Sequence, residues 1–231
     1  MQGKHTRMLQ WSKTRIYAGA VVLMTVLWVL SGCATSGKVK RASAVLGLSG
    51  AKGPSVARLE DGRQGFIIKE VPQMDAASHR DFERAVAMLE KQDYGRAIDL
   101  LEKVIAQSPG VTAPYINIAI AYQHIGKPEQ AEEHLKTALR LVPEHPVACN
   151  EYGLLYRKSG RFAEAREIYE KTLARFPDYY PVHRNLGILC DLYLNDSACA
   201  LDHYEIYSQN RPEDRQVKLW IADLRIRLGQ N

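Results

Sequence analysis

Cys33 is the residue whose sequence context points most directly to chemistry. It follows Leu30, Ser31 and Gly32 at the end of an apolar run, and four basic residues but no acidic residue precede that run. The run is shorter than the ~20 residues of a transmembrane helix, which argues against the alternative of a membrane-spanning anchor. A basic start, a short apolar core and small residues before a cut site are typical of a secretory signal peptide. We therefore expect residues 1–32 to be a secretory signal peptide.

Cys190 and Cys199 suggest a second kind of chemistry. They fall at the end of one predicted helix and the start of the next, on opposite sides of a tight turn. A Cα separation that allows a disulfide is plausible there, and export would place the pair in an oxidising compartment. We predict a Cys190–Cys199 disulfide, with two unlinked thiols as the alternative, and we expect Cys149 to be a free buried thiol.

A metal site is the other interpretation of this cysteine pair, because His183 and His203 are near it in sequence. The C-x8-C spacing is not one that zinc sites use, so we expect no metal and no cofactor. No G-x-S-x-G turn and no G-x-x-x-x-G-K-[ST] loop occurs, and the carboxylates are mixed with Lys and Arg as on solvated helix faces. We therefore expect that the chain is not an enzyme.

The elements that must position these residues recur with a period of 34. Small residues fall at 97, 131 and 165 and prolines at 109, 143 and 177, and both series continue with one extra residue at Ala200 and Pro212. Pro ends helices and small residues let helices cross closely. This pattern resembles the tetratricopeptide repeat, in which each unit is a helical hairpin that must stack on its neighbours to bury a core.

The period predicts eight helices in four hairpins. The predicted ranges are 79–91, 95–107, 112–125, 128–141, 146–159, 162–175, 180–193 and 197–210. A ninth helix, residues 213–228, carries an apolar stripe with Trp220 that we expect to pack on the fourth hairpin. We thus expect an all-α fold: an α-solenoid of four repeats over 78–212, closed by a capping helix in 213–231.

The same resemblance implies a binding groove. In tetratricopeptide arrays the first helix of each hairpin lines the concave surface, through its fifth, sixth, ninth, twelfth and thirteenth positions. The polar residues that match these positions are Asn117, Gln123, His124, Asn150, Arg157, Lys158, Arg184 and Asn185. Asn can pair with a peptide backbone and Arg with a carboxylate. The alternative is that these groups only keep a concave surface hydrated.

The carboxylate-clamp form of the repeat fits this groove incompletely. Phe82 and Val86 occupy first-hairpin positions where that form has Lys and Asn. We therefore expect a mixed apolar and polar grip on the bound segment rather than a strict clamp.

The net charge of +5 does not indicate a nucleic-acid partner. Residues 1–32 hold four of the 31 basic residues, so 27 basic and 26 acidic residues remain in the rest of the chain. A nearly balanced charge gives no reason to expect binding to nucleic acid.

Residues 33–77 show no helical period, and we expect a flexible tether with a short extended segment there. The stretch 34–58 is rich in Gly, Ser, Ala and Lys, as linkers are. The apolar residues Phe66, Ile67 and Ile68 follow an Asp-Gly turn signal. We expect them to pack on the first hairpin or in the groove, with a partner-binding strand as the alternative.

The sequence Leu-Ser-Gly-Cys also resembles the lipobox of bacterial lipoproteins. That resemblance implies lipidation of Cys33 and membrane attachment, and Ala34 after the cysteine favours the outer membrane over the inner membrane. Small repeat lipoproteins of similar build include pilotins of type IV pilus secretins and proteins associated with ExbB–ExbD–TonB systems.

The expected function is therefore a lipid-anchored periplasmic scaffold that binds a segment of an envelope protein. A recruiter or regulator of a cell-wall enzyme is the alternative.

Overall fold

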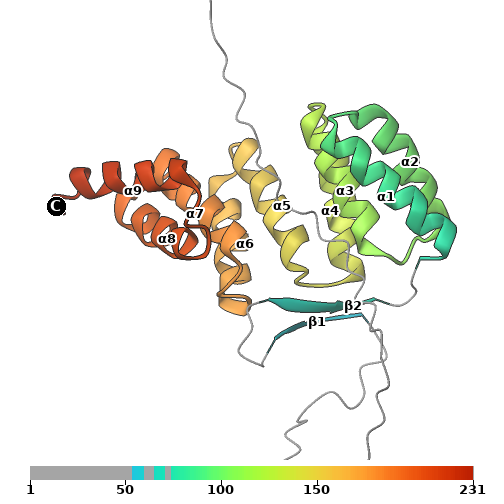
Figure 1. Ribbon diagram of the computed structural model, residues 1–231, viewed down its shortest axis with the longest axis horizontal. Coiled ribbons are helices and arrows are strands. Elements are labelled where there is room, and N and C mark those ends of the chain that lie inside the picture. The colour runs from blue at the N-terminus through green and yellow to red at the C-terminus, as the bar shows by residue number, and fades with distance from the viewer. Residues whose placement is uncertain (1–53, 60–64, 71–73, 231) are drawn as a thin grey trace, which may run out of the picture. The chain divides into compact units, whose positions relative to one another are not determined.

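We describe a computed structural model of the chain, which covers residues 54–59, 65–70 and 74–230. The predicted signal peptide, Cys33 and most of the predicted tether lie outside these residues. Within them are two short strands and nine helices, drawn in Figure 1: β1 (Ser55–Arg58), β2 (Phe66–Lys69), α1 (Ala76–Glu90), α2 (Tyr94–Gln107), α3 (Thr112–His124), α4 (Pro128–Leu141), α5 (Pro146–Lys158), α6 (Phe162–Arg175), α7 (Tyr180–Leu192), α8 (Ser197–Asn210) and α9 (Arg215–Arg227).

Local residue choices set the helix ends. Gly126 and Gly160 follow α3 and α5 with positive φ angles of 73° and 75°, a conformation that glycine adopts without steric cost. Pro128 and Pro146 begin α4 and α5, where a missing N–H breaks no helical hydrogen bond. The short turns that result force consecutive helices to lie antiparallel, so that each pair forms a hairpin.

Within the third and fourth hairpins, a glycine of the first helix lies against an aromatic ring of the second. A Cβ at Gly187 would lie 2.6 Å from ring atoms of Tyr204, and a Cβ at Gly153 would overlap the ring of Tyr169. Tyr169 and Tyr204 are among the most deeply buried side chains. The small residue is therefore what allows a large ring to fill the space between the two helices.

The fold class predicted from the sequence is confirmed. Each hairpin packs on the next, and α9 packs on α8 with Trp220 against Tyr204 at 5.2 Å between ring centroids. The observed helix ends differ from the predicted ones by three residues at most. No helix in the described ranges is both long and apolar enough to cross a membrane.

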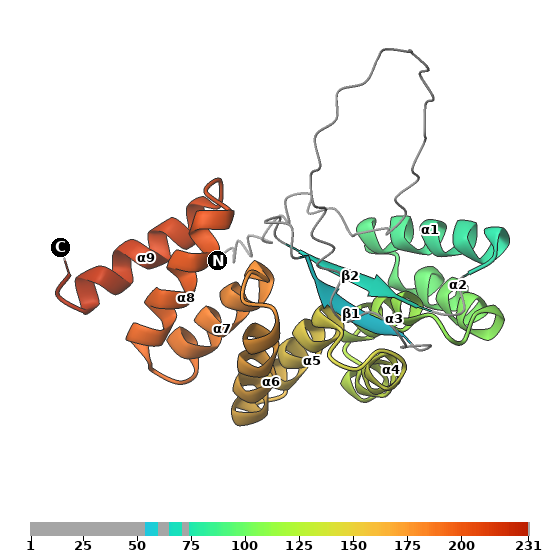
Figure 2. The same cartoon turned by 90° about the horizontal axis from the view of Figure 1, so that it is seen from below.

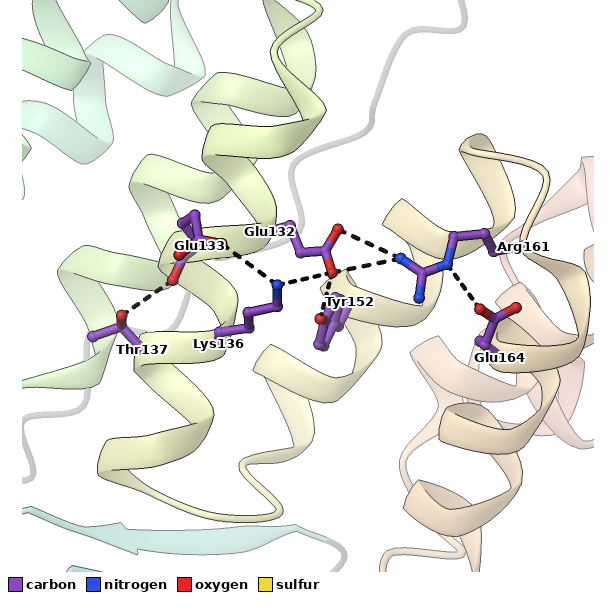
Figure 3. A network of polar contacts seen from close by, with 7 residues as sticks. All are labelled: Glu132, Glu133, Lys136, Thr137, Tyr152, Arg161 and Glu164. Carbon is purple, nitrogen blue, oxygen red and sulfur yellow. Dashed lines mark hydrogen bonds and ion pairs between the residues drawn. The ribbon is translucent and has the colours of Figure 1, made fainter.

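A network of polar side chains joins the second hairpin to the third (Figure 3). Glu132 of α4 accepts a hydrogen bond of 2.9 Å from the hydroxyl of Tyr152 in α5. It also pairs with Lys136 at 3.2 Å and with Arg161, at the start of α6, at 3.5 Å. One partly buried carboxylate thus ties three helices together, and this fixes how the two hairpins stack.

The two strands form an antiparallel hairpin, with Val56 opposite Ile68. β1 corrects the expectation that the chain is tether up to residue 58. The ring of Phe66 contacts Phe176 and Tyr179, at 5.8 and 5.4 Å between centroids, where α6 leads into α7. Of the two expected positions, the first hairpin and the groove, Phe66 therefore does not occupy the first, because its aromatic contacts are at the junction of the third and fourth hairpins.

The β-hairpin, whose two strands are drawn in Figures 1 and 2, is also held by two polar contacts. Arg58 forms an ion pair with Asp178 beside the Phe66 contact. The carboxylate of Glu70 accepts hydrogen bonds from the backbone N–H and the hydroxyl of Thr112 at the start of α3. The β-hairpin therefore joins the second hairpin of helices to the junction of the third and fourth.

Candidate functional site

The surface formed by α1, α3, α5 and α7, which we call the inner face, is the candidate site. These first helices contact one another directly from hairpin to hairpin, whereas α2, α4, α6 and α8 do not contact one another. Stacked hairpins that touch through one set of helices and separate at the other set curve toward the helices that touch. The first helices therefore line the inside of the array. The polar residues singled out in the sequence lie on these helices.

Asn150 and Asn185 are brought together across two hairpins. The side-chain N–H of Asn185 donates to Oδ1 of Asn150 at 2.9 Å, and Asn150 in turn donates to the carboxylate of Glu151 at 3.1 Å. Asn150 is buried, so these bonds satisfy groups that would otherwise be costly. The pair is a fixed link between α5 and α7.

Asn117 and Gln123, both on α3, are less satisfied. Asn117 is buried and donates to the carbonyl of Ala113 at 2.9 Å, but its Oδ1 has no hydrogen-bond partner among the described residues. Both side-chain amide atoms of Gln123 are also buried and lack a partner within the described chain. Unsatisfied buried groups are rare, and functional sites are one place where proteins retain them.

A group of cationic and aromatic side chains lies at the C-terminal ends of α3 and α5. His124 stacks on Tyr94 at 4.6 Å between centroids, and burial together with the charge of Lys158 lowers the pKa of this histidine. Burial also lowers the pKa of Lys158 and raises that of Glu151. The guanidinium of Arg157 lies 5.7 Å from the ring centroid of Tyr193.

Arg184 lies apart from this group, toward the C-terminal end of the array. Its guanidinium is 5.5 Å from the ring centroid of Trp220 and its Nε is 3.9 Å from the carboxylate of Asp214. A third of its side-chain surface stays exposed, which leaves room for an acidic partner group. The predicted groove residues therefore lie on one row of helices but form separate clusters.

The cysteines and histidines near the fourth hairpin do not form a metal site in the structure. Cys190 and Cys199 are joined in a disulfide with a Cα separation of 5.9 Å, and Cys149 is free and partly buried. Nδ1 of His183 lies 3.0 Å from Nδ1 of His203, and its Nε2 lies 2.9 Å from the carbonyl of Pro177. Where the structure describes the chain, no three His, Cys, Asp or Glu side chains are placed to hold a metal ion.

Glu151 is the inner-face residue that the sequence interpretation missed. It lies 34 residues after Asn117 and 34 before Asn185, so the period places it at the same position of its helix. Glu151 is a carboxylate at a position that holds an amide in the neighbouring hairpins. The 34-residue spacing alone identifies it as an inner-face residue. The arrangement as a whole offers amides, charges and half-buried aliphatic groups, which is chemistry for binding a polypeptide.

A family model described as tetratricopeptide repeat matches residues 78–148 and 126–186. A probable UDP-N-acetylglucosamine–peptide N-acetylglucosaminyltransferase SPINDLY of Solanum lycopersicum is 26% identical over 142 residues. That match covers 62% of this chain but only 15% of the tomato protein. The likeness is thus to a small part of a much longer protein.

Solved structures with the same fold include bacterial proteins. The structure of Pseudomonas aeruginosa pilF superposes with a TM-score of 0.62 and 21% identity, over 68% of this chain and 71% of that one. TTC0263 of Thermus thermophilus, a thermophilic TPR protein, gives a TM-score of 0.57 and 21% identity, over 64% and 81% of the two chains. The helical hairpins of this chain therefore form a tetratricopeptide-repeat domain.

Proposed function

We propose that this chain is a lipid-anchored scaffold at the outer membrane that faces the periplasm. Its repeat domain binds a segment of an envelope protein and so supports assembly of a membrane complex. The observation that carries the proposal is the inner face, where Asn117, Gln123, Asn150, Arg184 and Asn185 share one row of helices. Tetratricopeptide repeats are a protein-binding architecture, and extended inner surfaces of such arrays are what they use to bind.

The anchoring part of the proposal is supported by the sequence. The Leu-Ser-Gly-Cys segment at residues 30–33 follows a basic and then apolar start. Several acyl chains on Cys33 would exceed the two membrane signals that lasting attachment requires. Attachment through one residue leaves the repeat domain free to meet a partner in the periplasm.

The binding part is tested by affinity capture with a double variant of the inner face. Asn150→Ala/Arg184→Ala removes the cross-hairpin amide pair and a partly exposed cation, and we expect at least a fivefold loss of partner recovered. Glu167→Ala/Lys171→Ala is the matched control, because it removes one exposed ion pair of α6, away from the inner face. Equal recovery by both folded variants would rule the inner face out.

The identity of the captured protein then separates two roles. Recovery of a secretin or motor component supports assembly of a membrane complex. Recovery of a wall hydrolase or synthase would instead make the chain a recruiter of a cell-wall enzyme.

A further inference from the structure

We infer that His183 of α7 and His203 of α8 form a proton-operated latch, which holds the β-hairpin on the helices and releases it in acid. The inference concerns the strands β1 and β2 rather than the inner face, and it does not depend on the proposed function. It starts from two ring contacts. Nδ1 of His183 lies 3.0 Å from Nδ1 of His203, and Nε2 of His183 lies 2.9 Å from the carbonyl oxygen of Pro177.

The contact with Pro177 determines where the ring protons are. A carbonyl oxygen only accepts hydrogen bonds, so Nε2 of His183 must carry a proton and donate it. In the neutral ring of His183, Nδ1 then has no proton and accepts a hydrogen bond. Nδ1 of His203 must therefore carry the proton that lies between the two rings. The neutral pair thus holds one proton at Nε2 of His183 and one between the two Nδ1 atoms.

This arrangement admits one more proton but not two. A third ring proton fits at Nε2 of His203, because both existing hydrogen bonds are then kept. A fourth proton would put an N–H group on each of the two facing Nδ1 atoms, which are 3.0 Å apart. Neither nitrogen could then accept a hydrogen bond, and two positively charged rings would repel each other across this contact. The fully protonated pair therefore has to separate.

Separation acts on the turn between α6 and α7, to which the β-hairpin is attached. The ring of His183 is buried and donates to the carbonyl of Pro177 in this turn. Asp178, the next residue, forms the ion pair with Arg58 of β1. The ring of Phe66 packs on the two aromatic residues of the same turn. Movement of His183 out of its site therefore removes the hydrogen bond that fixes the attachment point of both strands.

The surroundings of the pair keep its rings neutral until the solution is acidic. Burial lowers the pKa of both histidines, that of His203 to about 4, where the charge of the neighbouring His183 also contributes. The charged groups that face the pair are Asp178 before α7, Asp202 of α8, and Arg166 and Glu170 of α6. The three carboxylates favour protonation and Arg166 opposes it, but the effect of burial is larger than that of these charges.

The sign of the pH dependence follows from the two states of the latch. A histidine exposed to water has a pKa near 6.5, so the released pair binds protons at a higher pH than the attached pair does. Between about pH 6.5 and pH 4 the released state therefore holds more protons, and a falling pH favours release. Attachment of the β-hairpin is fully present above this range and is lost within it.

For a chain anchored at Cys33, release lengthens the tether. An isolated two-stranded hairpin is at most marginally stable, so the freed strands can extend. The chain from Cys33 to the first attached residue then grows from 21 residues, counted to Pro54, to 37, counted to Glu70, which Thr112 still holds. The maximum reach rises from about 70 Å to about 130 Å. Only this consequence rests on the proposed anchor.

Hydrogen–deuterium exchange of the full chain at pH 6.5 and pH 4.5 tests the latch, with labelling times scaled to the intrinsic exchange rate at each pH. We expect the protection of residues 55–58 and 66–69 to fall at least tenfold at pH 4.5, because release takes up at least one proton. Unchanged protection of these strands overturns the latch. A fall no larger than that measured in α5 also overturns it, because it reflects the stability of the whole domain.

Two variants separate the pair from the other titrating groups. In His203→Asn, the side-chain amide can turn either its oxygen or its N–H₂ group toward His183, so protonation forces no separation. His183→Gln keeps a donor for the carbonyl of Pro177 but cannot titrate. Both variants leave the facing charges unchanged, and both should keep the protection of the strands at pH 4.5 within about twofold of its value at pH 6.5.

His145→Asn is the matched control, because it removes another buried histidine, at the start of α5. It should lose protection of the strands as the unaltered chain does. A tenfold loss in either variant of the pair, with its strands attached at pH 6.5, contradicts the inference. None of these outcomes depends on Cys33, so the latch and the proposed anchor fail or stand separately.

Discussion

At the scale of single residues, Gly187 makes a sharp test of how the hairpins pack. An alanine there would place its Cβ 2.6 Å from the ring of Tyr204, a buried side chain that has little room to move. Overpacking of this kind costs about 1–3 kcal/mol. We predict that Gly187→Ala lowers the free energy of unfolding by that amount in urea titration. Gly95→Ala is the control, because its added Cβ meets nothing within 4 Å, and an equal loss in both variants would contradict the packing argument.

The lowered pKa of the buried His145 should make the stability of the fold depend on pH. Burial lowers the pKa of His145 to about 4, and its Nδ1 accepts a hydrogen bond of 3.3 Å from the N–H of Ala148 at the start of α5. The unfolded chain binds a proton near pH 6.5, whereas the folded chain does not until about pH 4. The contribution of His145 to stability is therefore fully present above pH 6.5 and is lost as the pH drops from 6.5 toward 4.

The matching variant is His145→Asn, which keeps a side chain able to cap the helix but cannot titrate. Over pH 6.5 to 4.5 it should lose less stability than the unaltered chain, by on the order of 2 kcal/mol. Chemical unfolding at several pH values measures the difference. Parallel curves for the two proteins would show that His145 does not carry the pH dependence.

At the scale of elements, the Cys190–Cys199 disulfide closes the turn between α7 and α8. A closed loop of about ten residues contributes about 2–3 kcal/mol through the unfolded state. We predict that Cys190→Ser/Cys199→Ser lowers the free energy of unfolding by about that amount. In the denatured, unreduced Cys33→Ser chain, alkylation and mass spectrometry should find one free thiol, that of Cys149, and three free thiols would refute the bond.

The sequence was most informative where structure repeats. The helix ends followed from the 34-residue period together with Pro and Gly, because these signals act within one or two turns of the chain. The contact of Phe66 with Phe176 and Tyr179 could not be predicted in this way. Those residues are more than 100 positions apart, and no period links the β-hairpin to the helices.

The sequence likewise predicted the positions of the candidate-site residues but not the contacts between them. Repeat positions placed Asn150 and Asn185 on first helices, but not the hydrogen bond that joins them. That bond depends on how closely α5 approaches α7, which is set by packing throughout both hairpins. The same packing decides that Gln123 has buried amide atoms while Arg184 keeps a third of its side chain exposed.

At the scale of the whole molecule, the lipid anchor is the prediction that matters most for location. We predict that Cys33→Ser leaves unprocessed precursor and abolishes labelling with a radioactive fatty acid, because the acyl acceptor is gone. Ser31→Ala, a conservative change two residues before the cysteine, should be processed and labelled like the unaltered chain. Labelling that persists in Cys33→Ser would refute the site.

The attachment of β1 and β2 also determines where mechanical load enters the array. Tension on the chain before Pro54 reaches β1 first, and β1 is held through Arg58 to Asp178 between α6 and α7. The ring of Phe66 reinforces the same point, and Glu70 shares the load with α3. A pull on the N-terminal side is thus borne by the middle of the domain, and α1 and α2 are not the elements that it would unravel first.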